Sequence, residues 1–222
     1  IILSHEEIDE KTNEIPTAQK LFADLGLSDH IFTLDAMHCQ VNTLQSAVES
    51  NNDVIVQVKE NQPTLLSDCV NVTKLIDPND HYQEPESQQR NRIETWIVEV
   101  YDNVDAIDQK KWNLVESIIK VERKRQTFNT KTKRYDRSDE ISYFICTTNP
   151  SATQGCQAIR RHWGIENKNH YVKDVSMNED ASRIRINPQN FAKLRSFVLN
   201  ILRVNKIKNI QLELFENCLK ST

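Results

Sequence analysis

Hydrophobic residues in the first third of the chain fall into two strand-like runs separated by a helical repeat. Residues 31–35 (IFTLD) form a short apolar run that predicts a buried strand. Residues 54–58 (VIVQV) form a second run, rich in the β-branched residues that strands favour. Between them, residues 40–50 carry apolar side chains at helical spacing. A strand, a helix and a strand within about 30 residues predict a βαβ unit with parallel strands.

The segments on either side of this unit are also patterned. Residues 17–25 have helical periodicity and are followed by Gly26, a typical helix stop. Residues 67–90 are polar and irregular, so we expect a loop there. Three later runs predict strands, the middle one with a basic extension: residues 92–102, 112–126 and 140–149. The chain between the βαβ unit and residue 150 is therefore expected to be a β-rich block.

The last third of the chain has helical periodicity. Residues 151–178 predict a helical region with Ser151 as its N-cap. Asn187 and Pro188 predict the start of another strong helix. We interpret its apolar repeat as core: Phe191, Leu194, Phe197, Val198 and Ile201. Residues 205–222 are expected to form a frayed helical tail.

Composition limits the class of protein. The 222 residues are 38% hydrophobic and 27% charged, which predicts a soluble chain that can bury a core. The five cysteines form no CxxC pair, so we expect reduced thiols in a cytoplasmic protein. The sequence contains no run of about 18 apolar residues, so we expect no membrane span, and no signal peptide is visible. The apolar start at Ile1 looks like a chain entered in mid-strand, which suggests a fragment.

A net charge of −4 means that any surface for nucleic acid must be local. One strongly basic run exists, from Lys120 to Arg137, and it includes Lys124, Arg125, Lys133 and Arg134. Such a run can offset phosphate charge. Nearby Trp112, Phe128 and Tyr135 can stack on bases or simply pack. A solvated hairpin tip explains the basic run equally well.

Groups that do chemistry are concentrated between Arg160 and Asp180. Helical spacing puts an acid, a base, two imidazoles and an aromatic ring on one face: His162, Trp163, Glu166, His170 and Lys173. An ordinary solvated helix face is the plainer interpretation. The two histidines flank the glutamate at four residues on either side, a spacing that also permits a zinc site.

Several motifs resemble one family. HWGIEN at residues 162–167, followed by Asp174-Val175 and Glu179-Asp180, resembles the C-terminal signature of bacterial insertion-sequence transposases of the DDE class, in the ISAs family. Arg160 fits the RxHW form, and Glu166 with Lys173 fits the E-x6-K signature of related enzymes. TLDAMHCQ, which contains Asp35, resembles the segment with the second catalytic aspartate, and VKENQPTLL at 58–66 also resembles the family.

The resemblance implies an α/β, RNase H-like (retroviral-integrase-like) catalytic core. The core would be N-terminally truncated, with a first part over 1–66, a β-rich insertion over 67–149 and the return helix with C-terminal helices over 150–222. Asp35 and Glu166 would be the second and third carboxylates that hold two Mg²⁺ ions. The family's first aspartate lies upstream of everything matched here, so this chain is expected to be inactive as it stands.

The resemblance also implies DNA as partner, both the element ends and the target. Lys173, Arg160, Lys59 and Asn61 become candidate DNA contacts, beside the basic run. A homo-oligomer and a bacterial cytoplasmic location fit this class, and no membrane is expected. One alternative is a non-catalytic DNA-binding remnant or regulator of transposition. Another is an unrelated zinc hydrolase that uses the two histidines and Glu166.

Overall fold

The computed structural model describes residues 2, 14–89, 91–165 and 171–220. The chain divides into two compact units. One contains Asn13–His162, and the other contains Ile1–Thr12 with Trp163–Thr222. We describe each unit separately. None of the described helices is long and apolar enough to cross a membrane.

The predicted βαβ unit is confirmed, but the expectation that its first strand is buried is wrong, because β1 lies at the edge of the described sheet and none of its residues is fully buried. Strands β1 (Ile31–Leu34) and β2 (Asp53–Val58) pair in parallel, and helix α2 (Val41–Glu49) connects them. Helix α1 (Glu14–Asp24) precedes the unit, and a φ of 60° at Gly26 allows the chain to turn where the sequence predicted the stop. α1 packs on the unit through Phe22, whose ring meets that of Phe32 edge to face at 5.1 Å.

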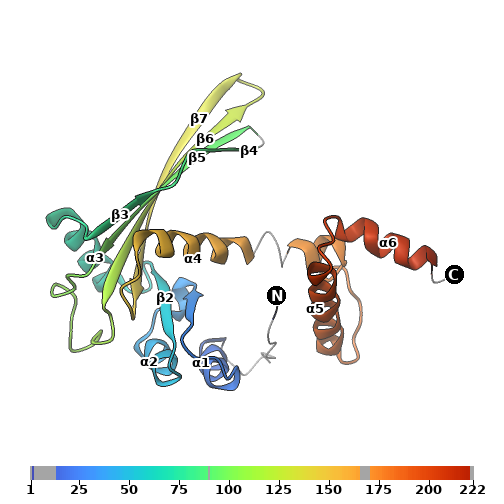
Figure 1. Ribbon diagram of the computed structural model, residues 1–222, viewed down its shortest axis with the longest axis horizontal. Coiled ribbons are helices and arrows are strands. Elements are labelled where there is room, and N and C mark those ends of the chain that lie inside the picture. The colour runs from blue at the N-terminus through green and yellow to red at the C-terminus, as the bar shows by residue number, and fades with distance from the viewer. Residues whose placement is uncertain (1, 3–13, 90, 166–170, 221–222) are drawn as a thin grey trace. The chain divides into compact units, whose positions relative to one another are not determined.

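The β-rich block continues the same sheet. Its strands are β3 (Asp80–Gln83), β4 (Ser87–Gln89), β5 (Arg92–Tyr101), β6 (Ser117–Asn129) and β7 (Arg134–Cys146). Six of the seven strands follow the order β1-β2-β7-β6-β5-β3, and β4 pairs with β5. The pairing of β7 with β2 is antiparallel, and β6 and β7 form a long hairpin (Figure 1). The boundaries predicted at residues 66 and 149 stay predictions, but hydrogen-bonded strands link the two parts.

The loop predicted for residues 67–90 is wrong. Helix α3 (Pro63–Leu75) occupies its start, and β3 and β4 occupy most of its end. Pro63 suits the first turn of a helix because that turn leaves its amide groups without helical partners. Leu65, Cys69 and Val72 are buried along one face of α3, whereas polar residues of the helix such as Asn71 and Lys74 are exposed.

Helices cover both faces of the sheet. On one face, side chains of α2 and α3 form a core with those of β2 and β6, including Leu44, Leu65, Val56 and Ile118. On the other face, helix α4 (Ala152–Ile165) approaches β6 closely. A Cβ atom at Gly155 would lie 3.0 Å from Ile119 Cδ1, so this glycine permits the close approach.

The N-terminus of α4 is capped as predicted. The Ser151 hydroxyl accepts a hydrogen bond from the Gln154 amide at 3.2 Å, and the Gln154 side chain accepts one from the Ser151 amide at 3.0 Å. This reciprocal pair is a capping box, which satisfies two amide groups that the helix leaves open.

The second unit contains a π-helical turn η3 (Val172–Ser176) and helices α5 (Pro188–Val204) and α6 (Ile210–Lys220). α5 begins at Pro188, as predicted. The predicted core residues of α5 are wrong. The helix exposes Phe191, Leu194, Phe197 and Ile201, and Val198 is half-buried. The buried residues of α5 are Ser196, Leu199 and Leu202. The last two each follow a predicted core residue by one position, which is about 100° around the helix.

Candidate active site

Asp35 directly follows β1, at the carboxyl end of the strand. Functional groups of open α/β sheets collect at this end. Asp35 precedes a short 3-10 turn, Ala36–His38, but its side chain makes no capping hydrogen bond to that turn. The side chain is 71% exposed. Asp35 therefore lies at the predicted strand end, and a capping role does not explain the residue; its catalytic role stays a prediction.

His162 on α4 binds the end of β1 through both ring nitrogens. Its Nε2 lies 3.1 Å from Asp35 Oδ1, and its Nδ1 lies 3.1 Å from Thr33 Oγ1. An ionised carboxylate only accepts hydrogen bonds, so Nε2 carries the proton in the contact with Asp35. α4 thus returns to the strand that ends at Asp35. The sequence did not predict this contact, because it indicated His162 only as a family motif residue or a zinc ligand.

Asn61, a predicted DNA contact, lies against the backbone that follows Asp35. Its side-chain amide donates to the Ala36 carbonyl at 2.7 Å, and the neighbouring Gln62 donates to the Cys39 carbonyl at 2.9 Å. The loop after β2 therefore holds the turn after Asp35. Lys59 is exposed at the end of β2 and lines a groove of about 340 Å³.

Glu166 and His170 lie outside the described residues, and α4 ends at Ile165, directly before Glu166. The distance between the Asp35 and Glu166 carboxylates stays a prediction, as does the zinc alternative. Within the described ranges, no group of three or more His, Cys, Asp or Glu side chains could hold a metal ion. In the other unit, Lys173 pairs with Glu179 at 3.2 Å, so its charge is already balanced by a carboxylate.

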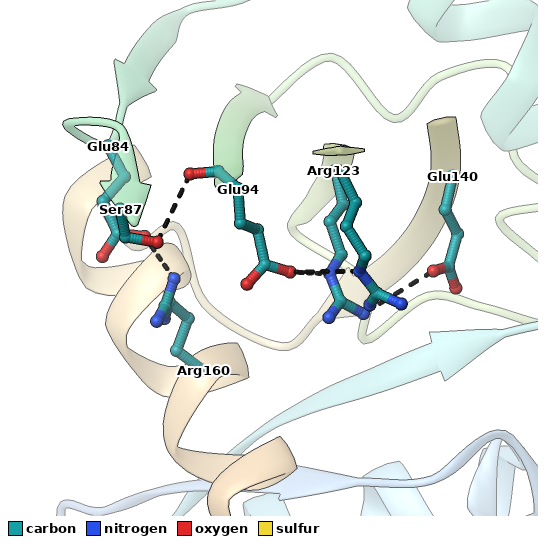
Figure 2. Close-up of polar contacts among 7 residues, drawn as sticks. Glu84, Ser87, Glu94, Arg123, Glu140 and Arg160 are labelled. Atoms are coloured by element: carbon teal, nitrogen blue, oxygen red, sulfur yellow. Dashed lines mark hydrogen bonds and ion pairs between the residues drawn. The ribbon is translucent and has the colours of Figure 1, made fainter. Parts of the chain in front are cut away.

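Arg160, another predicted DNA contact, is held inside a network between α4 and the sheet (Figure 2). Its guanidinium forms an ion pair with Glu84 and lies over the Trp96 ring, 5.1 Å from the ring centroid. Arg123 lies over the same ring at 5.3 Å and pairs with Glu94. Both contacts of Arg160 join α4 to the sheet, so the geometry favours a structural role.

Much of the basic run is neutralised along the strands. Lys120 pairs with Glu99 at 2.8 Å, and Lys124 pairs with Glu122 at 3.1 Å. Burial alone would raise the pKa of Glu99, but hydrogen bonds from Lys120 and Tyr101 hold this pKa below its usual value. Arg123 and Arg125 share the Glu94 carboxylate. Burial, followed by the charges of nearby Arg123 and Arg92, lowers the pKa of Arg125.

The tip of the β6–β7 hairpin keeps an exposed basic surface. Four exposed cations lie there, at the turn and the start of β7: Lys131, Lys133, Arg134 and Arg137. Tyr135 is 47% exposed and meets the Phe128 ring edge to face at 5.3 Å. Trp112 is buried in the core, so it packs and does not stack on bases.

A carboxylate at the open end of a strand, reached by a returning helix in a mixed α/β domain, is consistent with a DDE transposase domain. The transposase DDE domain family matches residues 5–201. The chain belongs to this family.

Curated relatives include "Putative transposase YncI" of Escherichia coli O157:H7, 29% identical over 213 residues, which are 91% of this chain and 53% of that protein. "H repeat-associated putative transposase YhhI" of Escherichia coli K12 is 29% identical over 216 residues, covering 93% of this chain and 56% of the relative. The chain thus spans about half the length of these relatives. Among solved structures, an S-adenosylmethionine-dependent methyltransferase from Clostridium acetobutylicum aligns over 59% of this chain and 45% of its own, at 8% identity and a TM-score of 0.23. A score this low does not indicate a shared fold.

Proposed function

We propose that this chain contributes the catalytic core of an insertion-sequence transposase of the ISAs family, which cleaves DNA and transfers strands. Asp35 and Glu166 are the second and third carboxylates of an RNase H-like site. The observation that carries the proposal is the contact of His162 with Asp35 at 3.1 Å. It holds His162, which lies four residues before Glu166 in the sequence, at the exposed end of β1.

The described part of the site offers one carboxylate ligand, that of Asp35, to a divalent cation. Asp35 offers an exposed carboxylate, and Mg²⁺ prefers oxygen ligands and keeps several water molecules. Within the described residues, His162 is the only side-chain hydrogen-bond partner of the Asp35 carboxylate. Asp35 and Glu166 would hold the metal, which when bound as a pair of ions supplies Lewis-acid stabilisation of the attacking and leaving oxygens of a phosphodiester.

Charge balance leads us to propose that the 222 residues alone are inactive. Two Mg²⁺ ions bring a charge of +4, and Asp35 with Glu166 supplies −2. A third carboxylate is needed to offset the remaining positive charge, and substrate phosphate cannot position both ions before it binds. In the family this carboxylate comes from a strand that precedes the matched segments.

A plasmid-nicking assay tests the catalytic proposal. We expect no Mg²⁺- or Mn²⁺-dependent nicking by the 222-residue chain, and nicking by a chain extended with the upstream strand and its aspartate. Asp35→Asn or Glu166→Gln should abolish the restored activity, with Asp102→Asn on an exposed loop as the matched control. Nicking by the 222-residue chain that is lost in Glu166→Gln would contradict the proposed division of the site.

The exposed hairpin tip supports a second candidate, a DNA-binding regulator without catalysis. Its cations do not depend on Asp35, and a two-stranded ribbon fits the major groove of DNA. Removing one cation that binds a phosphate should reduce the slope of log K against log salt by about 0.9.

Alanine variants separate the tip from the neutralised strands. We expect the Lys133→Ala/Arg134→Ala pair to weaken binding to random duplex DNA and to flatten the salt slope. Lys124→Ala/Arg125→Ala should have the smaller effect, because these cations already pair with Glu122 and Glu94. Lys74→Ala, on the exposed end of α3, is the control. An unchanged slope in the tip variant would make the tip an ordinary solvated surface.

A further inference from the structure

His162 is held on two sides, and this fixes the direction of its ring. Nε2 donates to Asp35 Oδ1, and Nδ1 lies at hydrogen-bond distance from the Thr33 hydroxyl. A neutral ring with its proton on Nε2 satisfies both contacts when the Thr33 hydroxyl donates to Nδ1. The His162 side chain is only 19% exposed, whereas Asp35 is 71% exposed. The imidazole is therefore the shielded partner and the carboxylate the accessible one.

The helix that carries His162 is itself fixed. Arg160, two residues earlier, binds Glu84 and Trp96 on the sheet. Residues two apart on a helix point about 200° away from each other. Contacts on nearly opposite sides of α4 thus determine its rotation as well as its position, and His162 has little freedom to leave Asp35.

We propose that His162 is a positioning residue for Asp35. By donating from Nε2, with Nδ1 held against the Thr33 hydroxyl, it holds the carboxylate in one orientation before a divalent cation binds. Partners that orient a ligand in this way commonly change metal affinity by about 10- to 100-fold. The inference rests on the proposed function, because it takes Asp35 as a metal ligand.

Nitrogen-15 NMR of the imidazole rings in the 222-residue chain tests the contact itself. We expect the His162 ring to carry its proton on Nε2 and to show a hydrogen-bonded Nδ1. Thr33→Val keeps the shape and strand preference of the residue and removes the hydroxyl, so it should shift the Nδ1 signal of a folded protein. An unprotonated Nε2 in the unchanged protein, or identical ring signals in Thr33→Val, would overturn the proposal.

Mn²⁺ titration, followed by paramagnetic broadening of the Thr33 and Ala36 amide signals, tests the consequence. We expect His162→Ala to raise the midpoint by about 10-fold. His162→Gln, whose amide can donate to Asp35 and accept from Thr33, should restore most of the affinity. His81→Ala on the exposed strand β3 is the matched control.

Two failures of this titration have different meanings. Equal midpoints for the unchanged protein and His162→Ala would overturn the positioning role and leave the metal site intact. No broadening in the unchanged protein, with the expected ring signals, would instead contradict the proposed function, and the positioning role would fall with it.

Discussion

Replacing Arg160 by alanine distinguishes a structural arginine from a DNA contact. The substitution removes the guanidinium that pairs with Glu84 and covers the Trp96 ring at 5.1 Å. The Arg160 and Glu84 side chains are 37% and 28% exposed, so solvent screening limits the ion pair to about 0.2–1 kcal/mol. A partly shielded cation–π contact contributes about 0.5–2 kcal/mol. Arginine and alanine are both good helix formers, so propensity offsets little of this loss.

We therefore expect Arg160→Ala to lower the free energy of unfolding by about 1–2 kcal/mol. Urea unfolding followed by tryptophan fluorescence measures this value. Arg161→Ala is the matched control, because Arg161 is the next residue on α4 and is exposed, and its effect should stay within about 0.5 kcal/mol. Adding Glu84→Gln completes a double-mutant cycle, in which a coupling energy of about 0.5 kcal/mol or more indicates direct interaction.

The opposite pattern would refute this reasoning. If Arg160→Ala unfolds like Arg161→Ala but binds duplex DNA more weakly with a flatter salt slope, Arg160 is a phosphate contact. The ion pair with Glu84 would then be incidental to the stability of the domain.

Three further predictions concern stability and use the same urea measurement. Leu44→Ala should cost about 2–5 kcal/mol, because Leu44 is 1% exposed in the core; a loss below about 1 kcal/mol would contradict its packing. Asn61→Ala should cost about 0.5–1.5 kcal/mol by removing the hydrogen bond to the Ala36 carbonyl, with Asn61→Gln as the comparison and an unchanged midpoint as the contrary result. Burial raises the pKa of the Cys146 thiol to about 12, from 9.0. As pH rises, the unfolded chain loses this proton before the folded chain does, so the stability contributed by the thiol is complete below pH 9 and lost as pH rises toward 12. Cys146→Ala should therefore reduce the loss of stability over this pH range. An identical pH profile of stability in the variant would contradict the prediction.

The βαβ unit was predictable because its signals are local. The runs at 31–35 and 54–58 are largely apolar, and the helix between them repeats at helical spacing. α3 was missed because a helix with one buried face and many polar residues has the composition of a loop. On α5 the helical period was predictable but the buried face was not, because that depends on which neighbour the helix packs against.

The strand-end position of Asp35 was predictable from the sequence, but its contacts were not; the catalytic roles of Asp35 and Glu166 stay predictions. Asp35 was assigned from its strand end and family segment, and the structure places it there. Its partner His162 lies 127 positions away, and no local pattern links the two residues. The pairing of Lys120 with Glu99 likewise depends on the register of β5 against β6, which the sequence does not display. The sequence therefore overstated how many cations of the basic run are available to bind DNA, because several of them pair with carboxylates on the strands.

The central claim is that the Asp35 and Glu166 carboxylates share one metal site. A crystal structure of the chain soaked in Mn²⁺, with anomalous scattering recorded at the manganese edge, tests this most directly. We expect an anomalous peak within about 2.5 Å of oxygens from both carboxylates, next to the His162 ring. Carboxylates more than about 10 Å apart, too far to share ions spaced about 3.5–4 Å, with no manganese between them, would contradict the claim.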